Sequence, residues 1–155
     1  MREQFLREAI RLATQKMLAG EGGPFGAVVV RDGQIVGTGW NRVTTCNDPT
    51  AHAEVNAIRD ACSRLRTFCL EGCELYSSCE PCPMCLAAVY WARLDRIYYA
   101  ATRDDAAAAG FDDAHIYEDI SKPIRDRSLA AEQLLRSEGI VSFDAWMKKE
   151  DRVPY

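Results

Sequence analysis

The sequence lacks a hydrophobic segment long enough to cross a membrane. Its longest apolar runs, residues 27–30 and 85–92, fall well short of the roughly 20 residues that a transmembrane helix needs. The first residues mix charged and apolar side chains, without the unbroken apolar segment of a signal peptide. Linkers rich in proline, glycine or serine are missing as well. We therefore expect one domain over residues 1–155, located in the cytoplasm and without a membrane partner.

An excess of basic charge is also absent. The chain carries 19 lysines and arginines against 23 aspartates and glutamates, which gives a net charge of −4. Proteins that bind nucleic acid present a basic face that neutralises phosphates, and no basic cluster stands out here. The charge pattern favours a small uncharged or cationic ligand and excludes nucleic acid from the expected partners.

Cysteine, by contrast, is abundant. Seven cysteines occur in 155 residues, an odd number that no secretion signal accompanies. In a cytosolic protein such cysteines serve as metal ligands or as small buried side chains rather than as a disulfide framework. The cysteine content therefore directs attention to a metal site.

Hydrophobic periodicity predicts alternating helices and strands as far as residue 101. Helices are expected at 2–19, 51–65 and 81–93, and strands at 25–31, 34–40, 73–78 and 96–101. Asp32-Gly33 is typical of a hairpin turn, and Asp48 or Thr50 is expected to cap the second helix. The helix at 81–93 is apolar on nearly every side, which indicates burial. This order predicts an α/β fold, a three-layer α/β/α sandwich around a mixed central sheet.

Beyond Thr102 the periodic signal weakens. A short helical piece or loop is expected at 104–110, with further helices at 128–137 and 143–149. The last residues, 151–155, are expected to be extended.

Two short motifs carry the chemistry. They are His52-Ala-Glu54 and, about thirty residues later, Pro81-Cys82-Pro-Met-Cys85, and together they resemble the H-x-E and P-C-x-x-C signature of zinc-dependent deaminases. Two cysteines three residues apart share one face of a helix, and in its first turn the helix dipole favours their thiolates. His52 supplies a third ligand. Three protein ligands leave one position for water, the arrangement of a catalytic zinc ion.

Glu54 follows His52 by two residues, which would place the two side chains on opposite faces in mid-helix. Both approach one site if they lie in the opening turn, and the preceding loop at 48–50 favours that placement. There Glu54 would carry protons from water to the substrate without binding the metal.

Two other metal sites fit part of the cysteine pattern. A closed structural zinc site would need a fourth ligand, for which Cys79 is the candidate. An iron–sulfur cluster would need a fourth cysteine at position 89, where the sequence has Val89. The remaining cysteines are expected to be small buried side chains or idle thiols: Cys46, Cys62, Cys69 and Cys73.

The wider sequence resembles the cytidine deaminase superfamily and, within it, the bacterial guanine deaminases. The superfamily resemblance rests on residues 50–62 and 78–93, and the narrower one on the A-x-x-A-G-F-D-D-x-x-I-Y pattern at 106–117, on Lys122-Pro123 and on Phe143-Asp-Ala-Trp146. The resemblance implies a zinc-dependent hydrolysis of guanine to xanthine and ammonia, in which zinc-activated water attacks C2 of the purine. It also implies a homodimer that exchanges a C-terminal segment of about residues 127–155.

The resemblance further implies roles for individual residues. Asp113 would be a second carboxylate that moves protons, although Asp112 or Glu118 would serve equally well by position. The implied substrate-binding residues are Phe25, Asn41, Ala53, Trp91 and Tyr155. Plainer structural roles exist for several of them: Asn41 as a turn former, Asp112-Asp113 as a helix cap, and Tyr155 as an untethered terminus.

Other functions remain open at this stage. The same zinc chemistry serves tRNA adenosine deaminases and enzymes that act on cytosine, cytidine or triazines, although the acidic net charge disfavours an RNA substrate. A zinc-stabilised binding module without catalysis is a further alternative. Glu54 argues against it, because a structural site has no use for a carboxylate beside the metal.

Overall fold

The computed structural model describes residues 2–155 and divides the chain into two compact units, Met1–Asp113 and Ala114–Tyr155. The first unit is built on one four-stranded sheet in the order β2-β1-β3-β4. Its strands are β1 (Gly26–Arg31), β2 (Gln34–Trp40), β3 (Cys73–Cys79) and β4 (Arg96–Ala101). β1 pairs antiparallel with β2 and β3, whereas β3 and β4 are parallel. The sheet is therefore mixed, as the sequence predicted.

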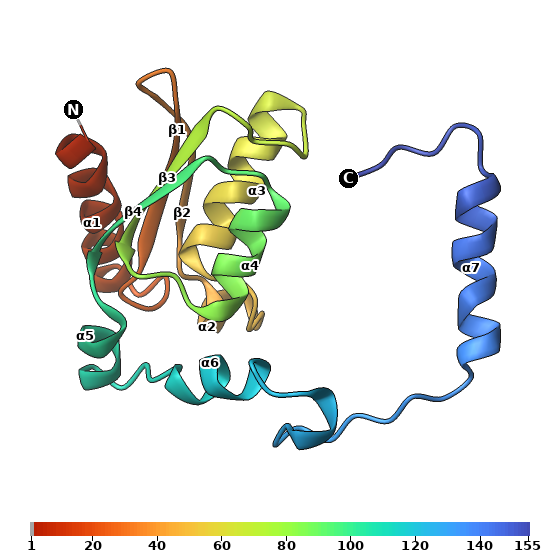
Figure 1. Cartoon of the computed structure of the whole chain (residues 1–155). Helices are drawn as coiled ribbons and strands as arrows, with labels where there is room; N and C mark the ends of the chain where they lie inside the picture. The colour runs from red at the N-terminus through yellow and green to blue at the C-terminus, as the bar shows by residue number, and fades with distance from the viewer. Residues whose placement is uncertain (1) are drawn as a thin grey trace. The chain divides into compact units, whose positions relative to one another are not determined.

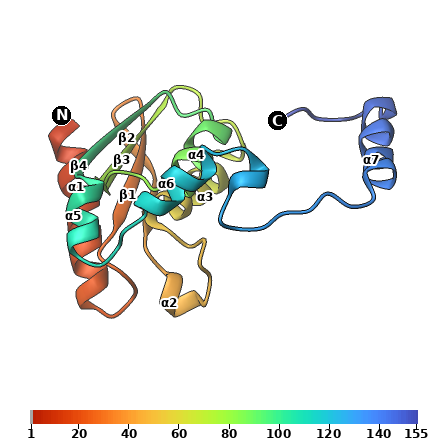
Figure 2. The same cartoon turned by 60° about the horizontal axis from the view of Figure 1, so that its bottom comes forward.

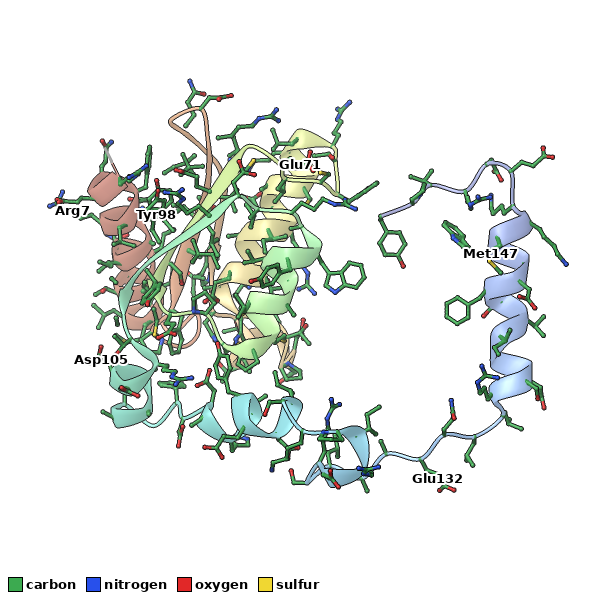
Figure 3. The ribbon with its side chains drawn as sticks, viewed as in Figure 1. Arg7, Glu71, Tyr98, Asp105, Glu132 and Met147 are labelled. Carbon is green, nitrogen blue, oxygen red and sulfur yellow. The ribbon has the colours of Figure 1, made fainter. Side chains whose placement is uncertain are left out.

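Helices cover both faces of this sheet (Figure 1). On one face α1 (Arg2–Leu18) packs Phe5 and Leu12 against Val28 and Tyr76. Figure 3 labels Tyr98, whose ring stacks on that of Tyr76 at a centroid distance of 4.8 Å. On the other face lie α3 (Ala53–Leu65) and α4 (Pro83–Trp91), whose apolar side chains share a core with alternate residues of β1 and β3. The predicted three-layer α/β/α architecture is confirmed.

α3 approaches β2 so closely that β2 needs glycine at the contact. A Cβ atom on Gly39 would lie 2.2 Å from the carbonyl oxygen of Ala53, and one on Gly37 would lie 2.5 Å from that of Ala57. Both distances are far below van der Waals contact, and both partners are helix backbone. The two glycines thus set the spacing between the sheet and the helix that begins beside His52.

The ends of several elements differ from the sequence prediction. His52, rather than Asp48 or Thr50, is the N-cap of α3, because the Asp48 carboxylate instead accepts hydrogen bonds from the Thr50 amide and hydroxyl at 2.8 and 2.7 Å. The loop at 41–50 contains a short helix, α2 (Val43–Cys46), that the pattern did not indicate. α5 (Arg103–Ala108) is helical and is opened by a capping box on Thr102.

The prediction that the helix at 81–93 is buried on all sides was wrong. Its side chains at Pro83, Cys85 and Val89 are buried, but Tyr90 and Trp91 are 76% and 68% exposed. An apolar composition does not say which side of a helix its neighbours cover.

The second unit contains α6 (Ala114–Ile120), the 3₁₀ turn η1 (Ile124–Asp126) and α7 (Arg136–Lys148) (Figure 2). The predicted helices at 128–137 and 143–149 were wrong in their bounds, since one helix spans 136–148. The Asp119 carboxylate holds the Ser128 amide at 2.9 Å, and Leu135 adopts a left-handed conformation with φ 52° before α7 begins. No residue of this unit is buried. The prediction of a single domain with an exchanged segment stays a prediction.

Candidate functional site

Three predicted ligands meet at the openings of two helices. His52 is the N-cap of α3, Cys82 is the N-cap of α4, and Cys85 lies in the first turn of α4. The Nδ1 atom of His52 lies 3.5 Å from each of the two sulfur atoms, and the three ligand atoms all lie within 4.8 Å of one another. The sequence motif and the geometry therefore select the same three residues.

The spacing of these atoms fits zinc. A tetrahedral ion with Zn–N near 2.05 Å and Zn–S near 2.3 Å separates nitrogen from sulfur by about 3.5 Å, which matches both observed distances. One imidazole and two thiolates are also a donor set that zinc favours. The site is therefore a candidate zinc centre with three protein ligands and a fourth position for water.

The local electrostatics favour a thiolate at this point. Hydrogen bonding with Cys85, followed by hydrogen bonding with His52, lowers the pKa of Cys82 to about 4. The hydrogen bond with Cys82 raises the pKa of His52, whereas a bound zinc ion would take the neutral imidazole as its ligand. The unsatisfied amides of the α4 N-terminus act in the same direction as these contacts.

The alternative metal sites fit this geometry less well. The Cys79 thiol donates a hydrogen bond to the carbonyl oxygen of Thr102 at 3.4 Å, and Cys79 is not one of the residues that gather around the three ligand atoms. Among the described residues no fourth protein ligand joins the group. This arrangement is that of an open site rather than a closed structural one.

Glu54 lies beside the ligands in the first turn of α3, as the spacing of the motif predicted. It is 5% exposed. Its Oε2 atom accepts a hydrogen bond from the Cys85 thiol at 3.3 Å, and its Oε1 atom accepts one from the Ser77 hydroxyl at 3.2 Å. Burial raises the pKa of Glu54. A carboxyl group with a raised pKa next to a metal site is suited to taking up and releasing protons.

A cavity of 510 Å³ opens onto His52, Cys82 and Glu54. The phenyl rings of Phe25 and Phe111 meet on its wall edge to face, with centroids 5.0 Å apart and planes at 87°. The other residues that line it are Gly22, Gly23, Asn41, Val43, Thr44, Cys79, Glu80, Arg103, Ala106, Asp112 and Asp113. The cavity is large enough for a planar bicyclic base and offers both aromatic and polar walls.

Asn41 lines the cavity but has one of its two polar atoms occupied. Its Oδ1 atom accepts hydrogen bonds from the backbone amides of Gly23 and Val43, both at 3.2 Å. The NH₂ group of Asn41 is therefore left to donate to a ligand, whereas its oxygen atom already accepts from the protein backbone. Asn41 thus serves as a loop former and as a cavity residue at once.

Asp113 and Asp112 both line the cavity. Burial, followed by the charge of Cys82, raises the pKa of Asp113, as expected for a carboxyl group in a partly apolar wall. Glu118 belongs to the second unit.

Three predicted substrate-binding residues do not line this cavity in the part of the chain that is described. Trp91 ends α4 and is 68% exposed, and Ala53 is the first residue of α3 and is wholly buried. Tyr155 belongs to the second unit, where its side chain is 74% exposed. Their roles stay predictions.

Sequence reasoning missed several residues of the site. Ser77 is 1% exposed and contacts Glu54, and Phe111 and Arg103 line the cavity from the segment after β4. A hydroxyl at an inward position of a buried strand was a signal for Ser77. Phe111 stood in the pattern at 106–117 without an assigned role, and nothing in the local pattern indicated Arg103, because the proximity of both to the ligands depends on the path of the chain after β4.

The comparisons with known proteins agree with this geometry. Residues 1–101 match the sequence model of the family described as the cytidine and deoxycytidylate deaminase zinc-binding region. The guanine deaminase of Bacillus subtilis is 52% identical over 153 residues, which cover 99% of this chain and 98% of that protein. Its X-ray structure superimposes with a TM-score of 0.96 over the same shares of the two chains.

Two further relatives are more distant. A tRNA-specific adenosine deaminase of Aquifex aeolicus is 45% identical over 100 residues, which cover 64% of this chain and 66% of that protein. The crystal structure of the protein NE0047 in complex with 2,6-diaminopurine matches with a TM-score of 0.69 and 36% identity, over 73% of this chain and 63% of that one. Among the described residues, no helix has the length and hydrophobicity needed to span a membrane. The chain belongs to the zinc-binding family of cytidine and deoxycytidylate deaminases.

Proposed function

We propose that this protein is a zinc-dependent guanine deaminase, which hydrolyses guanine to xanthine and ammonia. The observation that carries the proposal is the 52% identity to the Bacillus subtilis guanine deaminase across nearly the whole of both chains, together with a cavity that joins the three metal ligands to Glu54. The relatives named as tRNA-specific adenosine deaminases share a shorter part of the chain. The match to the Bacillus subtilis enzyme, in contrast, includes the segment after residue 101. This segment contributes Phe111 and Asp113 to the cavity.

His52, Cys82 and Cys85 would hold the zinc ion. When bound, the ion supplies an acidified water molecule that serves as a nucleophile near neutral pH. The side chains of the protein bind the substrate and transfer protons. Glu54 would carry protons to a ring nitrogen and to the departing amine, one at a time, because its carboxyl group is buried beside the ligands and has a raised pKa.

The cavity walls suit a purine. Phe25 and Phe111 offer an aromatic surface on which a flat base can pack. The Asn41 amide group is left to donate a hydrogen bond, for which the guanine carbonyl oxygen and ring nitrogens are acceptors. Asp113 is the second carboxyl group that we assign to proton transfer, since it lines the same cavity as Glu54.

The function is tested by measuring ammonia release from zinc-replete protein with guanine, guanosine, adenine, cytosine and cytidine as separate substrates. Release from guanine is the expected result, and no release from guanosine would show that the cavity excludes a ribose. The Glu54→Gln variant is the matched control, since it keeps the shape of the side chain but not its acid–base chemistry. Release from cytosine or cytidine alone would refute guanine as the substrate while retaining a deaminase.

The zinc assignment is tested separately. Metal analysis should give one zinc ion per chain, and removal by a chelator should abolish ammonia release until zinc is returned. Full activity of zinc-free protein would refute the assignment.

We also propose that the protein is a homodimer in which the C-terminal segments, about residues 127–155, are exchanged. The second unit has no buried residue, yet α7 exposes Val141, Phe143 and Met147 by more than 60% each. Exposed apolar side chains on a unit without a core of its own need a partner surface. A second copy of the chain is the partner that the proposal names.

A mixing experiment tests the exchange. One variant carries Glu54→Gln with an intact tail, and the other has normal Glu54 but lacks Val153–Tyr155, so that each should be poorly active alone. If Tyr155 completes the neighbouring site, unfolding and refolding the two together should restore activity. Failure of the mixture, or full activity of the shortened chain alone, would refute the role of the tail.

A further inference from the structure

Ser77 places a hydroxyl group in the otherwise apolar face of β3. The side chains of Cys73 and Leu75, four and two residues earlier, belong to the core shared with α3, and alternation along the strand puts Ser77 on the same face. Ser77 is 1% exposed. A buried hydroxyl is costly unless it forms a hydrogen bond, so its partner identifies what this serine does.

The hydroxyl has two partners: its oxygen accepts a hydrogen bond from the Cys79 amide at 3.5 Å, and its proton is donated to Glu54. The Ser77 hydroxyl donates to Oε1 of Glu54 at 3.2 Å, and the Cys85 thiol donates to Oε2 at 3.3 Å. The two contacts fix opposite oxygens of one carboxyl group. A Cys85 thiolate bound to zinc has no proton to give, so in the zinc-loaded protein Ser77 would be the side chain that still donates to Glu54.

We infer that Ser77 is a positioning residue for Glu54, an inference that rests on the proposed function. The terminal torsion of a glutamate is soft and roughly two-fold, so a free carboxyl group rotates. The bond from Ser77 to Oε1 stops that rotation and keeps Oε2 on the side of the metal ligands. Proton transfer needs this placement, because the carboxyl oxygen must lie within hydrogen-bond reach of the reacting atoms.

The test compares three substitutions in zinc-replete protein. Ser77→Ala removes the hydroxyl, and Ser77→Thr retains it. Ser78→Ala is the matched control: it removes a hydrogen bond from the same strand, since the Ser78 hydroxyl accepts from the Gly26 amide at 3.0 Å, without touching Glu54. Thermal unfolding and zinc content of each variant establish that it is folded and loaded.

The expected pattern separates positioning from a structural role. Ser77→Ala should lower kcat for guanine by about 10- to 100-fold, the range for loss of a hydrogen bond to a charged group, with KM changed less than about twofold because the serine does not line the cavity. Ser77→Thr should restore most of kcat, and Ser78→Ala should leave it unchanged. An equal loss of kcat in Ser77→Ala and Ser78→Ala would overturn the inference.

A second readout does not depend on turnover. In protein labelled with ¹³C-glutamate, the infrared band that Glu54→Gln abolishes belongs to Glu54. Ser77→Ala should shift that band, and Ser78→Ala should not. An unshifted band with normal kcat overturns the inference but leaves the proposed function intact. If the parental protein does not deaminate guanine, the function fails, and the band alone decides whether Ser77 holds Glu54.

Discussion

Replacing Gly39 with alanine would drive α3 away from the sheet. The new Cβ atom would lie 2.2 Å from the carbonyl oxygen of Ala53 and 2.3 Å from the amide nitrogen of Ala57. Ordinary van der Waals contact begins near 3.4 Å, so the helix would have to retreat by roughly 1 Å. Because both contacts are backbone atoms of a helix, no rotamer change can relieve the clash.

The retreat has two calculable consequences. Overpacking of this kind costs about 1–3 kcal/mol of unfolding free energy. Ala53 lies between His52 and Glu54, so the same shift displaces the proposed zinc ligand and the proposed proton carrier together. A misplacement of about 1 Å at a catalytic group can cost on the order of 100-fold in rate. We therefore expect a modest loss of stability and a much larger loss of kcat/KM.

Urea unfolding and guanine kinetics check this expectation. A neutral surface change alters the free energy of unfolding by no more than about 0.5 kcal/mol. If the free energy of unfolding of Gly39→Ala differs from that of the parental protein by no more than this, and kcat/KM is unchanged, the close approach of α3 does not set the site geometry.

Three further predictions concern single side chains. Glu54→Gln should lower ammonia release by at least about 100-fold while zinc content and the unfolding midpoint are retained; normal turnover would remove Glu54 from proton transfer. Burial, with a further contribution from Glu54, raises the pKa of Cys79 to about 11, so iodoacetamide at pH 7.5 should leave Cys79 unmodified in the folded protein, and rapid labelling detected by mass spectrometry would contradict this. The hydrogen bond from the Ser128 amide lowers the pKa of Asp119 to about 2, so its stabilising effect is complete above the ordinary pKa of about 4 and is lost as the pH falls toward 2. The stability difference between the parental protein and Asp119→Asn should accordingly shrink in acid unfolding experiments, and a difference independent of pH would refute the assignment.

Local patterns predicted the first unit well. The helix expected at 2–19 is Arg2–Leu18, and the four strands lie within one residue or so of their predicted bounds. Alternating or helical periodicity identifies these elements because each has a face in a core formed by the same unit. The second unit offered no such signal, since none of its residues is buried, and there the predicted helix bounds failed.

Local sequence patterns also failed to predict where α3 begins and which side of α4 is exposed. Asp48 and Thr50 are good helix caps by type, yet they bond to each other and His52 begins α3. Trp91 lies in a helix that is apolar on every side, yet it is exposed. For the two cap residues, competing hydrogen-bond partners decided the outcome. For Trp91, it was decided by which side of α4 packs into the core.

The sequence by itself determined the chemistry of the site. The resemblance of the two motifs to the zinc-deaminase signature predicted three ligands and a proton carrier. Within each motif, residues so near one another in the chain are placed in one opening turn by helix geometry alone. Only the tertiary structure decided which distant groups act on them. It brought the Ser77 hydroxyl within hydrogen-bond distance of Glu54 and the Cys79 thiol within that of the Thr102 carbonyl oxygen. It also directed two backbone amides to the Asn41 oxygen, since hydrogen bonds between separate elements depend on how the sheet and helices pack.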